Sequence, residues 1–306
     1  MSGCISGFVG RVAVQPLDVL KIRFQLQVEP ISSKHPTAGK YSGFFQSIRC
    51  IYHEEGFSAF WKGHVPAQAQ AISFAAVQFL SFELISQFAL HQIHRSDPQV
   101  TKLPPFSNFI SGCFAGACAA IATQPLDVLR TRFIAQGSEK VYSNILNGCT
   151  MIIQTAGIRG LFLGLAPTLF LIAPQTGLQF GFYNMLTSSL HKFNDSALPL
   201  TSLETLISGA MAGALAKIIV YPLDVAKKRM QVQGFEAARE KFGKVHTSSG
   251  LRECLLITVR EEGLHALFKG LTPALIKSCI SVGVRFSVYN KMCMLLDTYR
   301  ADRPSS

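Results

Sequence analysis

One phrase occurs three times in this chain and strongly limits what the chain can fold into. It reads QPLDVLKIRFQLQ at residues 15–27, QPLDVLRTRFIAQ at 124–136 and YPLDVAKKRMQVQ at 221–233. In each copy a proline follows an apolar segment, an aspartate comes two residues after the proline, and a lysine or arginine comes three residues after the aspartate. A phrase repeated in this way indicates a chain built from several copies of one structural unit.

A second phrase has the same period. It reads EGFSAFWKGHVPA at 55–67, AGIRGLFLGLAPT at 156–168 and EGLHALFKGLTPA at 262–274. The prolines of the first phrase are 109 and 97 residues apart, and the glycines that close FWKG, FLG and FKG are 101 and 106 residues apart. We therefore divide the chain into three repeats, at residues 1–95, 104–194 and 201–300.

Each repeat contains two apolar segments, one before the proline and one after the second phrase. The six segments are residues 1–20, about 64–90, 107–129, 165–190, 204–226 and 271–297. Each is long enough to cross a hydrocarbon core of about 30 Å as a helix. Charged residues make up 15% of the chain, against about 25% in soluble proteins. We predict an all-α membrane protein with six transmembrane helices in three pseudo-symmetric two-helix repeats, and short amphipathic helices such as residues 44–56 between them.

The net charge of +11 and the eight cysteines exclude several classes of function. The basic residues form no single-faced stripe and no nucleic-acid-binding module, so we expect no nucleic-acid partner. They gather in the loops after the first, third and fifth apolar segments, which places those loops on the positive-inside face. The cysteines lack CxxC or metal-ligand spacing, and no nucleophile–base pair appears. We therefore expect reduced cysteines, no metal, no cofactor and no catalytic residues.

The acids and bases of the first phrase suggest a ring. An aspartate and a base three residues later share one helix face, and a proline kinks a helix. Three kinked helices that converge would bring six charged groups to one level of the membrane: Asp18, Lys21, Asp127, Arg130, Asp224 and Lys227. The alternative is three local pairs, each worth about 0.2–0.5 kcal/mol. The repetition of the same proline argues against that alternative.

These phrases resemble, over the whole chain, those of the mitochondrial carrier family, whose signature is Pro-x-[Asp/Glu]-x-x-[Lys/Arg] in triplicate, followed by [Asp/Glu]-Gly and aromatic-[Lys/Arg]-Gly. The resemblance implies a monomeric solute carrier that crosses the mitochondrial inner membrane six times. It also implies that the ring is a matrix gate, in which each acid pairs with the next repeat's base. Gln25 and Gln231 match the family's braces of this gate, whereas Ile134 stands at the third position. The family usually has a longer leader, so we expect a short first helix.

Other family positions depart from the pattern. The second copy of the second phrase has Ala156 for the acid and Leu163 for the base. The positions of the cytoplasmic gate carry Glu83, Tyr183 and Tyr289, and only Glu83 is charged among the six acid and base positions. We therefore expect a weak cytoplasmic gate and a preference for the matrix-closed state. The resemblance further implies that membrane lipids, cardiolipin among them, bind where helices start at Gly63, Gly164 and Gly270.

Cations inside the predicted membrane segments are candidates for solute binding, because charge is costly there. Arg11 and Lys217 lie seven residues before the aspartates of their phrases, nearly two helical turns, and so share the side that bears the ring. The family's solute contact points lie on the second helix of each repeat, and matching them adds further candidate residues. The predicted solute-binding residues are Arg11, Gln70, Leu171, Ile172, Lys217, Lys277 and Arg285. Cations without a cavity acid favour a multiply anionic, phosphorylated solute, although long cationic side chains also snorkel to the interface.

Several functions remain open from the residues alone. The leading hypothesis is exchange of a phosphorylated solute against a nucleotide, and adenine nucleotides and coenzyme A are alternative solutes. A proton or anion uniporter and an adaptor without transport are less favoured alternatives. The adaptor is disfavoured because all three acid–base sets and the cavity cations are intact.

Overall fold

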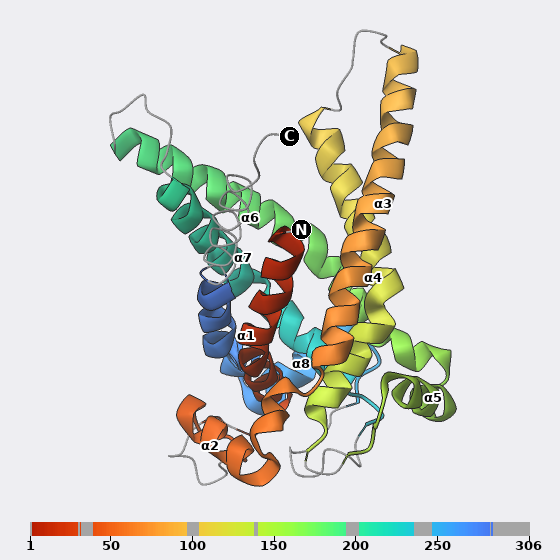
Figure 1. The fold of residues 1–306 in the computed structure, drawn as a ribbon, viewed down its shortest axis with the longest axis vertical. Coiled ribbons are helices and arrows are strands. Elements are labelled where there is room, and N and C mark those ends of the chain that lie inside the picture. The colour runs from red at the N-terminus through yellow and green to blue at the C-terminus, as the bar shows by residue number, and fades with distance from the viewer. Residues whose placement is uncertain are drawn as a thin grey trace, which may run out of the picture.

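The computed structural model describes residues 2–29, 31, 39–96, 104–137, 140–193, 202–235, 247–281 and 283 (Figure 1). Within these residues every regular element is helical. The long helices are α1 (Ser2–Leu26), α3 (His64–Ser96), α4 (Pro105–Ala135), α6 (Leu165–Phe193) and α7 (Ser202–Gln231), followed by a helical segment at 271–281. The short elements are α2 (Phe44–Glu55), η1 (Phe57–Trp61), α5 (Ile145–Ala156), η2 (Ile158–Phe162), α8 (Leu251–Glu262) and η4 (Leu264–Phe268).

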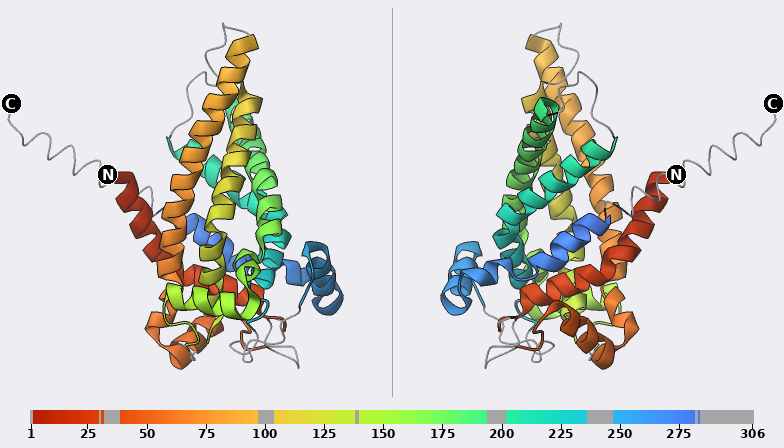
Figure 2. Two further views of the ribbon diagram at one scale, coloured as in Figure 1. Left: turned by 90° about the vertical axis from the view of Figure 1, so that its right-hand side faces the viewer. Right: turned by 90° about the vertical axis from the view of Figure 1, so that its left-hand side faces the viewer.

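The long helices pair across the repeats. Helix α3 packs along α4, and α6 packs along α7, although each pair joins two different repeats. The two pairs diverge towards one end of the molecule and converge with α1 at the other (Figure 1). Helices α2, α5 and α8 lie towards this convergent end, as two further views show (Figure 2). The long helices are therefore closest together where the proline phrases lie and spread apart at the opposite end (Figure 1).

Four of the described helical stretches are long and apolar enough to cross a membrane. They are Phe57–Arg95, Phe106–Ala135, Ile158–Leu190 and Glu204–Gln231. Helix α1 is less apolar because four charged side chains lie on it: Arg11, Asp18, Lys21 and Arg23. The sixth predicted helix, residues 271–297, lies outside the described part of the chain beyond residue 283.

The predicted bounds 1–20, 107–129 and 204–226 end the first helix of each repeat within the proline phrase. The corresponding helices α1, α4 and α7 are longer than predicted. They run on to Leu26, Ala135 and Gln231, with each proline inside a continuous helix. A proline leaves the carbonyl four residues earlier without its helical donor. In α1 that carbonyl belongs to Val12, and the indole Nε1 of Trp61 donates to it at 3.3 Å. This bond helps to explain how the helix continues past Pro16.

One hydrogen bond recurs in all three repeats and ties the two phrases together. The residue before each proline donates its side chain to the carbonyl oxygen of the residue before the closing glycine of the second phrase. The three bonds are Gln15 to Lys62 at 3.0 Å, Gln124 to Leu163 at 2.8 Å and Tyr221 to Lys269 at 3.1 Å. Each repeat thus fixes the start of its second long helix against its first.

The closing glycines fix the repeats to one another. Gly63, Gly164 and Gly270 have φ of 73°, 75° and 81°, which favours glycine. A Cβ atom at these positions would lie 3.0, 3.0 and 2.8 Å from the carbonyl oxygens of Arg130, Lys227 and Lys21. Each glycine therefore permits close contact with the base of a neighbouring repeat's proline phrase, and the three contacts close a circle around the convergent end.

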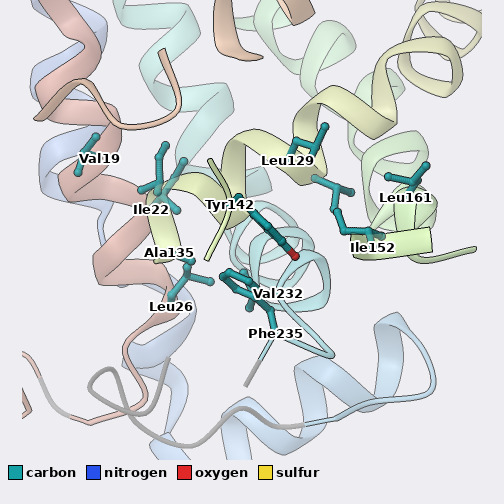
Figure 3. Packing of buried hydrophobic residues seen from close by; sticks show 12 residues of the cluster. Val19, Ile22, Leu26, Leu129, Ala135, Tyr142, Ile152, Leu161, Val232 and Phe235 are labelled. Carbon is teal, nitrogen blue, oxygen red and sulfur yellow. The ribbon is translucent and has the colours of Figure 1, made fainter. Parts of the chain in front are cut away.

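All three repeats contribute to one apolar core below this circle (Figure 3). Val19, Ile22 and Leu26 come from α1, Leu129 and Ala135 from α4, and Val232 and Phe235 from the turn that follows α7. The ring of Tyr142 stacks on that of Phe235 at 4.8 Å between centroids. Because burial of apolar surface is the dominant stabilising contribution, this shared core holds α1, α4 and α7 together at their carboxyl ends.

Candidate solute site and gate

The three aspartates of the proline phrases pair with bases from other repeats. Arg130 Nη2 lies 2.6 Å from Asp18 Oδ2, Lys227 Nζ lies 2.8 Å from Asp127 Oδ2, and Lys21 Nζ lies 2.5 Å from Asp224 Oδ2. Each pair joins two of the helices α1, α4 and α7, so the three pairs form a closed ring. All three pairs implied by the resemblance described above are present in the structure.

Additional donors make the three junctions unequal. Lys277 Nζ reaches the other oxygen of Asp18 at 2.6 Å. Lys228 Nζ lies 3.0 Å from Asp127 Oδ1, and the amide of Gln231 donates to Asp127 Oδ2 at 2.8 Å. Asp224 accepts from Gln25 Nε2 at 3.3 Å. The two glutamines therefore contact the ring, as the resemblance implied.

Lys228 was not predicted from the sequence. Its ammonium group also donates to Thr131 Oγ1 and Gln231 Oε1, at 3.0 and 2.9 Å, and its side chain is buried. The equivalent residues of the other repeats are Ile22 and Thr131. A comparison of repeats therefore carries no signal for a base at this position, and only the run of two lysines at 227–228 distinguishes it.

A second layer of bases lies directly below the ring. Arg23, Arg132 and Arg229 come two residues after the three gate bases. The Nε atom of each donates to a carbonyl oxygen of another repeat, in the pairs Arg23 to Ile134 at 3.3 Å, Arg132 to Gln231 at 3.1 Å and Arg229 to Gln25 at 3.1 Å. The triplicated arginine is visible in the sequence, but its inter-repeat bonds to backbone oxygens are not.

The predicted solute-binding cations lie at and just above the ring. Arg11 and Lys277 line one small pocket together with Asp18 and Arg130. Lys217 does not line that pocket; it is half-buried on α7, close enough to Lys21 and Asp224 for electrostatic interaction. Within the described residues Lys217 forms no ion pair or hydrogen bond. The structure thus places Arg11 and Lys277 in the pocket and Lys217 outside it, next to Lys21 and Asp224.

The other predicted residues are placed as follows. Gln70 is half-buried on α3 and Leu171 is half-buried on α6. The side chain of Ile172 packs against α4, 3.3 Å from where a Cβ on Gly116 would lie, and its role as a solute contact stays a prediction. Glu83 is exposed and accepts from Gln87 of its own helix at 2.7 Å, and Tyr183 is half-buried. Arg285 and Tyr289 lie outside the described residues.

Comparison with known proteins identifies this arrangement. The family described as mitochondrial carrier protein matches residues 1–92, 101–194 and 199–300. The chain belongs to the mitochondrial carrier family. It is 44% identical to a bovine mitochondrial thiamine pyrophosphate carrier and 43% identical to the human one, covering 96% of this chain and 91% and 90% of those proteins. It is 35% identical to mitochondrial thiamine diphosphate carrier 1 of Arabidopsis thaliana, over 94% of this chain and 90% of that protein.

Membership of the mitochondrial carrier family confirms the predicted fold, a six-helix membrane protein. The roles assigned to individual residues rest on the geometry above. For Gly63, Gly164 and Gly270, predicted as lipid positions, the structure supplies a packing reason for glycine, the close approach of backbone oxygens. Lipid binding at the same helix starts stays a prediction.

In the second layer of bases, formed by Arg23, Arg132 and Arg229, the arginine of the second repeat lacks a carboxylate partner among the described residues. Arg23 pairs with Glu55 at 2.6 Å, and Arg229 pairs with Glu262. Ala156 stands in place of those acids, and Arg132 forms no ion pair with any described residue. Its guanidinium donates to Tyr142 Oη at 3.2 Å and to the Gln233 carbonyl at 2.8 Å, and it lies 5.5 Å from the centroid of the Phe235 ring. A buried cation is held here by neutral acceptors.

We expect Ala156→Glu to raise the thermal stability of the detergent-solubilised protein. The new carboxylate would meet the buried Arg132 as Glu55 meets Arg23, and hydrogen bonds to charged groups contribute about 1.5–3 kcal/mol. Ala156→Gln is the control, because it adds nearly the same volume without the charge. A melting temperature that is unchanged or lowered in Ala156→Glu would show that the neutral acceptors already satisfy Arg132.

Proposed function

We propose that this protein carries thiamine pyrophosphate across the mitochondrial inner membrane into the matrix. The observation that carries the proposal is a closed ring of ion pairs with a surplus of cations at the convergent end of the helices. Arg11, Lys217 and Lys277 lie on or beside this ring. Relatives at 43–44% identity over nearly the whole chain are named mitochondrial thiamine pyrophosphate carriers.

The proposed mechanism is alternating access. The convergent end is the matrix side, where the ion-pair ring closes the path, and the divergent end opens to the cytoplasm (Figure 1). Glu83, Tyr183 and Tyr289 belong to the cytoplasmic gate, which has few charges and therefore closes weakly. An empty protein rests in the state whose closed gate is more stable, so the matrix-closed state is favoured. The transport cycle is an exchange, with a nucleotide as counter-solute.

The cations account for the diphosphate of the solute. Arginine and lysine bind phosphate through charge-assisted hydrogen bonds. Lys277 has a second role, because its ammonium group already contacts Asp18 of the gate at 2.6 Å. A phosphate that binds Lys277 competes with Asp18 for the same donor. Gln70 and Leu171 face the part of the solute that carries no phosphate. An adenine nucleotide or coenzyme A remains the second candidate solute, because either offers phosphate to the same cations.

We expect Lys217→Gln and Lys277→Gln to weaken thiamine pyrophosphate uptake about tenfold or more, the size expected for a lost hydrogen bond to a charged group. Lys217→Gln isolates solute binding, since Lys217 forms no ion pair with the described residues. Lys277→Gln also loosens the gate at Asp18.

The measurement is competition against labelled thiamine pyrophosphate in liposomes by thiamine, thiamine monophosphate and thiamine pyrophosphate. Potency should rise in that order, because each step adds phosphate. Thiamine that competes as well as its diphosphate would show that the cations do not bind phosphate. Competition by nucleotides alone would support the second candidate solute.

A further inference from the structure

A polar pair at the start of α3 has no counterpart in the other repeats. His64 and Gln68 lie one turn apart, with 3.3 Å between His64 Nε2 and Gln68 Nε2. They stand one and five residues after Gly63, and the equivalent residues are Leu165 and Leu169 in the second repeat and Leu271 and Leu275 in the third. Because leucine serves at these positions twice, the start of the helix does not require polar side chains.

His64 has unused hydrogen-bonding capacity. Its Nδ1 atom is buried and has no hydrogen-bond partner among the described residues. A buried polar atom without a partner costs free energy, and such atoms in native proteins often mark a ligand site. A neutral imidazole can donate or accept at this atom. The imidazole is therefore available to a bound group, and Arg130 Nε beside it is likewise buried without a partner among the described residues.

Both side chains line the small pocket that also contains Arg11, Asp18, Arg130 and Lys277. Three of these residues are cations, and the two oxygens of Asp18 are already occupied by Arg130 and Lys277 at 2.6 Å each. The pocket thus has a surplus of positive charge next to two neutral hydrogen-bonding groups. This combination suits an anion that accepts several hydrogen bonds, and a phosphoryl group is of that kind.

The size of the pocket limits what can enter it. Its volume is about 80 Å³, whereas sites for whole drug-sized ligands are about 300–1,000 Å³. The pocket therefore has room for a small group such as a phosphoryl group and not for a whole thiamine pyrophosphate molecule. A solute of that length can place only one end in it.

We propose that this pocket binds the terminal phosphoryl group of the solute, and that His64 and Gln68 make the carrier prefer a diphosphate over a monophosphate. The inference rests on the proposed function, because it assigns one part of that solute to one part of the site. Lys217 lies outside the pocket and remains available to the rest of the solute. The neutral pair contributes hydrogen bonds whose geometry depends on the position of the phosphoryl oxygens, which charge alone would not select.

The test replaces each residue by the leucine that the other repeats carry, in His64→Leu and Gln68→Leu. In the liposome assay, the concentrations of thiamine pyrophosphate and thiamine monophosphate that halve uptake are compared for each variant. Thiamine pyrophosphate should lose about twofold to tenfold in potency, as for a neutral hydrogen bond, while the monophosphate keeps its potency. His91→Leu, the same substitution on the exposed far end of α3, should change neither value.

Two further measurements separate the possible failures. His64→Gln retains a donor and an acceptor and should restore part of the preference, which a purely structural role of the imidazole would not produce. Thermal unfolding with inorganic pyrophosphate or inorganic phosphate tests the pocket without the thiamine part, because a ligand that binds only the folded state raises the melting temperature.

If no thiamine compound competes, the proposed function fails, and a pyrophosphate-specific stabilisation lost in both leucine variants would still support the pocket. Equal loss for diphosphate and monophosphate, or no loss for either, would overturn the inference.

Discussion

Replacing Glu55 by glutamine is expected to destabilise the protein by about 3–5 kcal/mol, the usual result of removing one partner from a buried ion pair. The side chains of Glu55 and Arg23 are each 1% exposed, and two parallel hydrogen bonds of 2.6 and 2.7 Å join them. Lys62 Nζ adds a third contact to Glu55 at 2.5 Å. Glutamine keeps the shape but leaves two cations without their counter-charge. The measurement is thermal unfolding of the purified protein in detergent.

The neighbouring Glu54 offers a matched control. It pairs with Lys40 at 2.5 Å, but its side chain is 48% exposed, and exposed pairs contribute about 0–1 kcal/mol. Glu54→Gln should therefore change the melting temperature little. Equal effects of the two substitutions would show that burial of the Arg23–Glu55 pair does not determine its contribution.

Acidification should reduce the difference between Glu55→Gln and the unmodified protein. Burial would raise the pKa of the Glu55 carboxyl, but the hydrogen bonds and charges of Arg23 and Lys62 hold that pKa below its ordinary value. A carboxyl whose pKa is lower in the folded state contributes stability above its unfolded pKa and loses this contribution as the pH falls through its folded pKa. The unmodified protein should therefore lose stability on acidification, and the variant should lose less.

Reversal of the Lys21–Asp224 pair is expected to abolish and then restore transport. Lys21→Asp alone or Asp224→Lys alone places two like charges where the closed ring has a 2.5 Å ion pair. The cost of breaking a buried pair, about 3–5 kcal/mol, corresponds to more than a hundredfold in an equilibrium constant. The double variant Lys21→Asp, Asp224→Lys restores the attraction and should recover part of the uptake of labelled thiamine pyrophosphate in liposomes.

The same reversal at Asp127 and Lys227 should recover less transport, because Lys228 also contacts Asp127. A lysine at position 127 would face the ammonium group of Lys228, which lies 3.0 Å from Asp127 Oδ1. Thermal unfolding of each variant separates loss of transport from loss of folding. If the Lys21–Asp224 double variant transports no better than the worse single variant, the pair does not act as a gate.

The ring was predictable because repetition supplied what one copy could not. A single aspartate and lysine three residues apart describe an ordinary surface pair, whereas three copies that follow the same proline predict a ring of charges. The pairing of Asp18 with Arg130 and its two equivalents came from the resemblance to the carrier family. The helix ends were not predictable in the same way. Proline normally interrupts a helix, and the sequence does not show that Trp61 would reach the carbonyl of Val12.

Residues that break the symmetry of the repeats were the hardest to assign. Lys228 has no basic counterpart in the other repeats, so its contact with Asp127 appears only in the folded chain. Spacing from Gly164 placed Leu171 and Ile172 near the solute, but spacing does not determine which of two adjacent side chains packs on the next helix. Ile172 packs against Gly116 because glycine leaves room there. Lys277 was predicted as a solute ligand. Its ion pair with Asp18 was not predicted, because the two residues are 259 positions apart in the sequence.

The unequal junctions of the ring also have an electrical consequence. Among the described contacts, five cationic groups surround three carboxylates, a surplus of two positive charges: Lys21, Arg130, Lys227, Lys228 and Lys277 against Asp18, Asp127 and Asp224. Moving one elementary charge through the full membrane potential changes the energy by about 2.3 kcal/mol per 100 mV. A bound anion cancels part of the surplus, so the loaded and empty carriers respond differently to voltage when these side chains change position across the field.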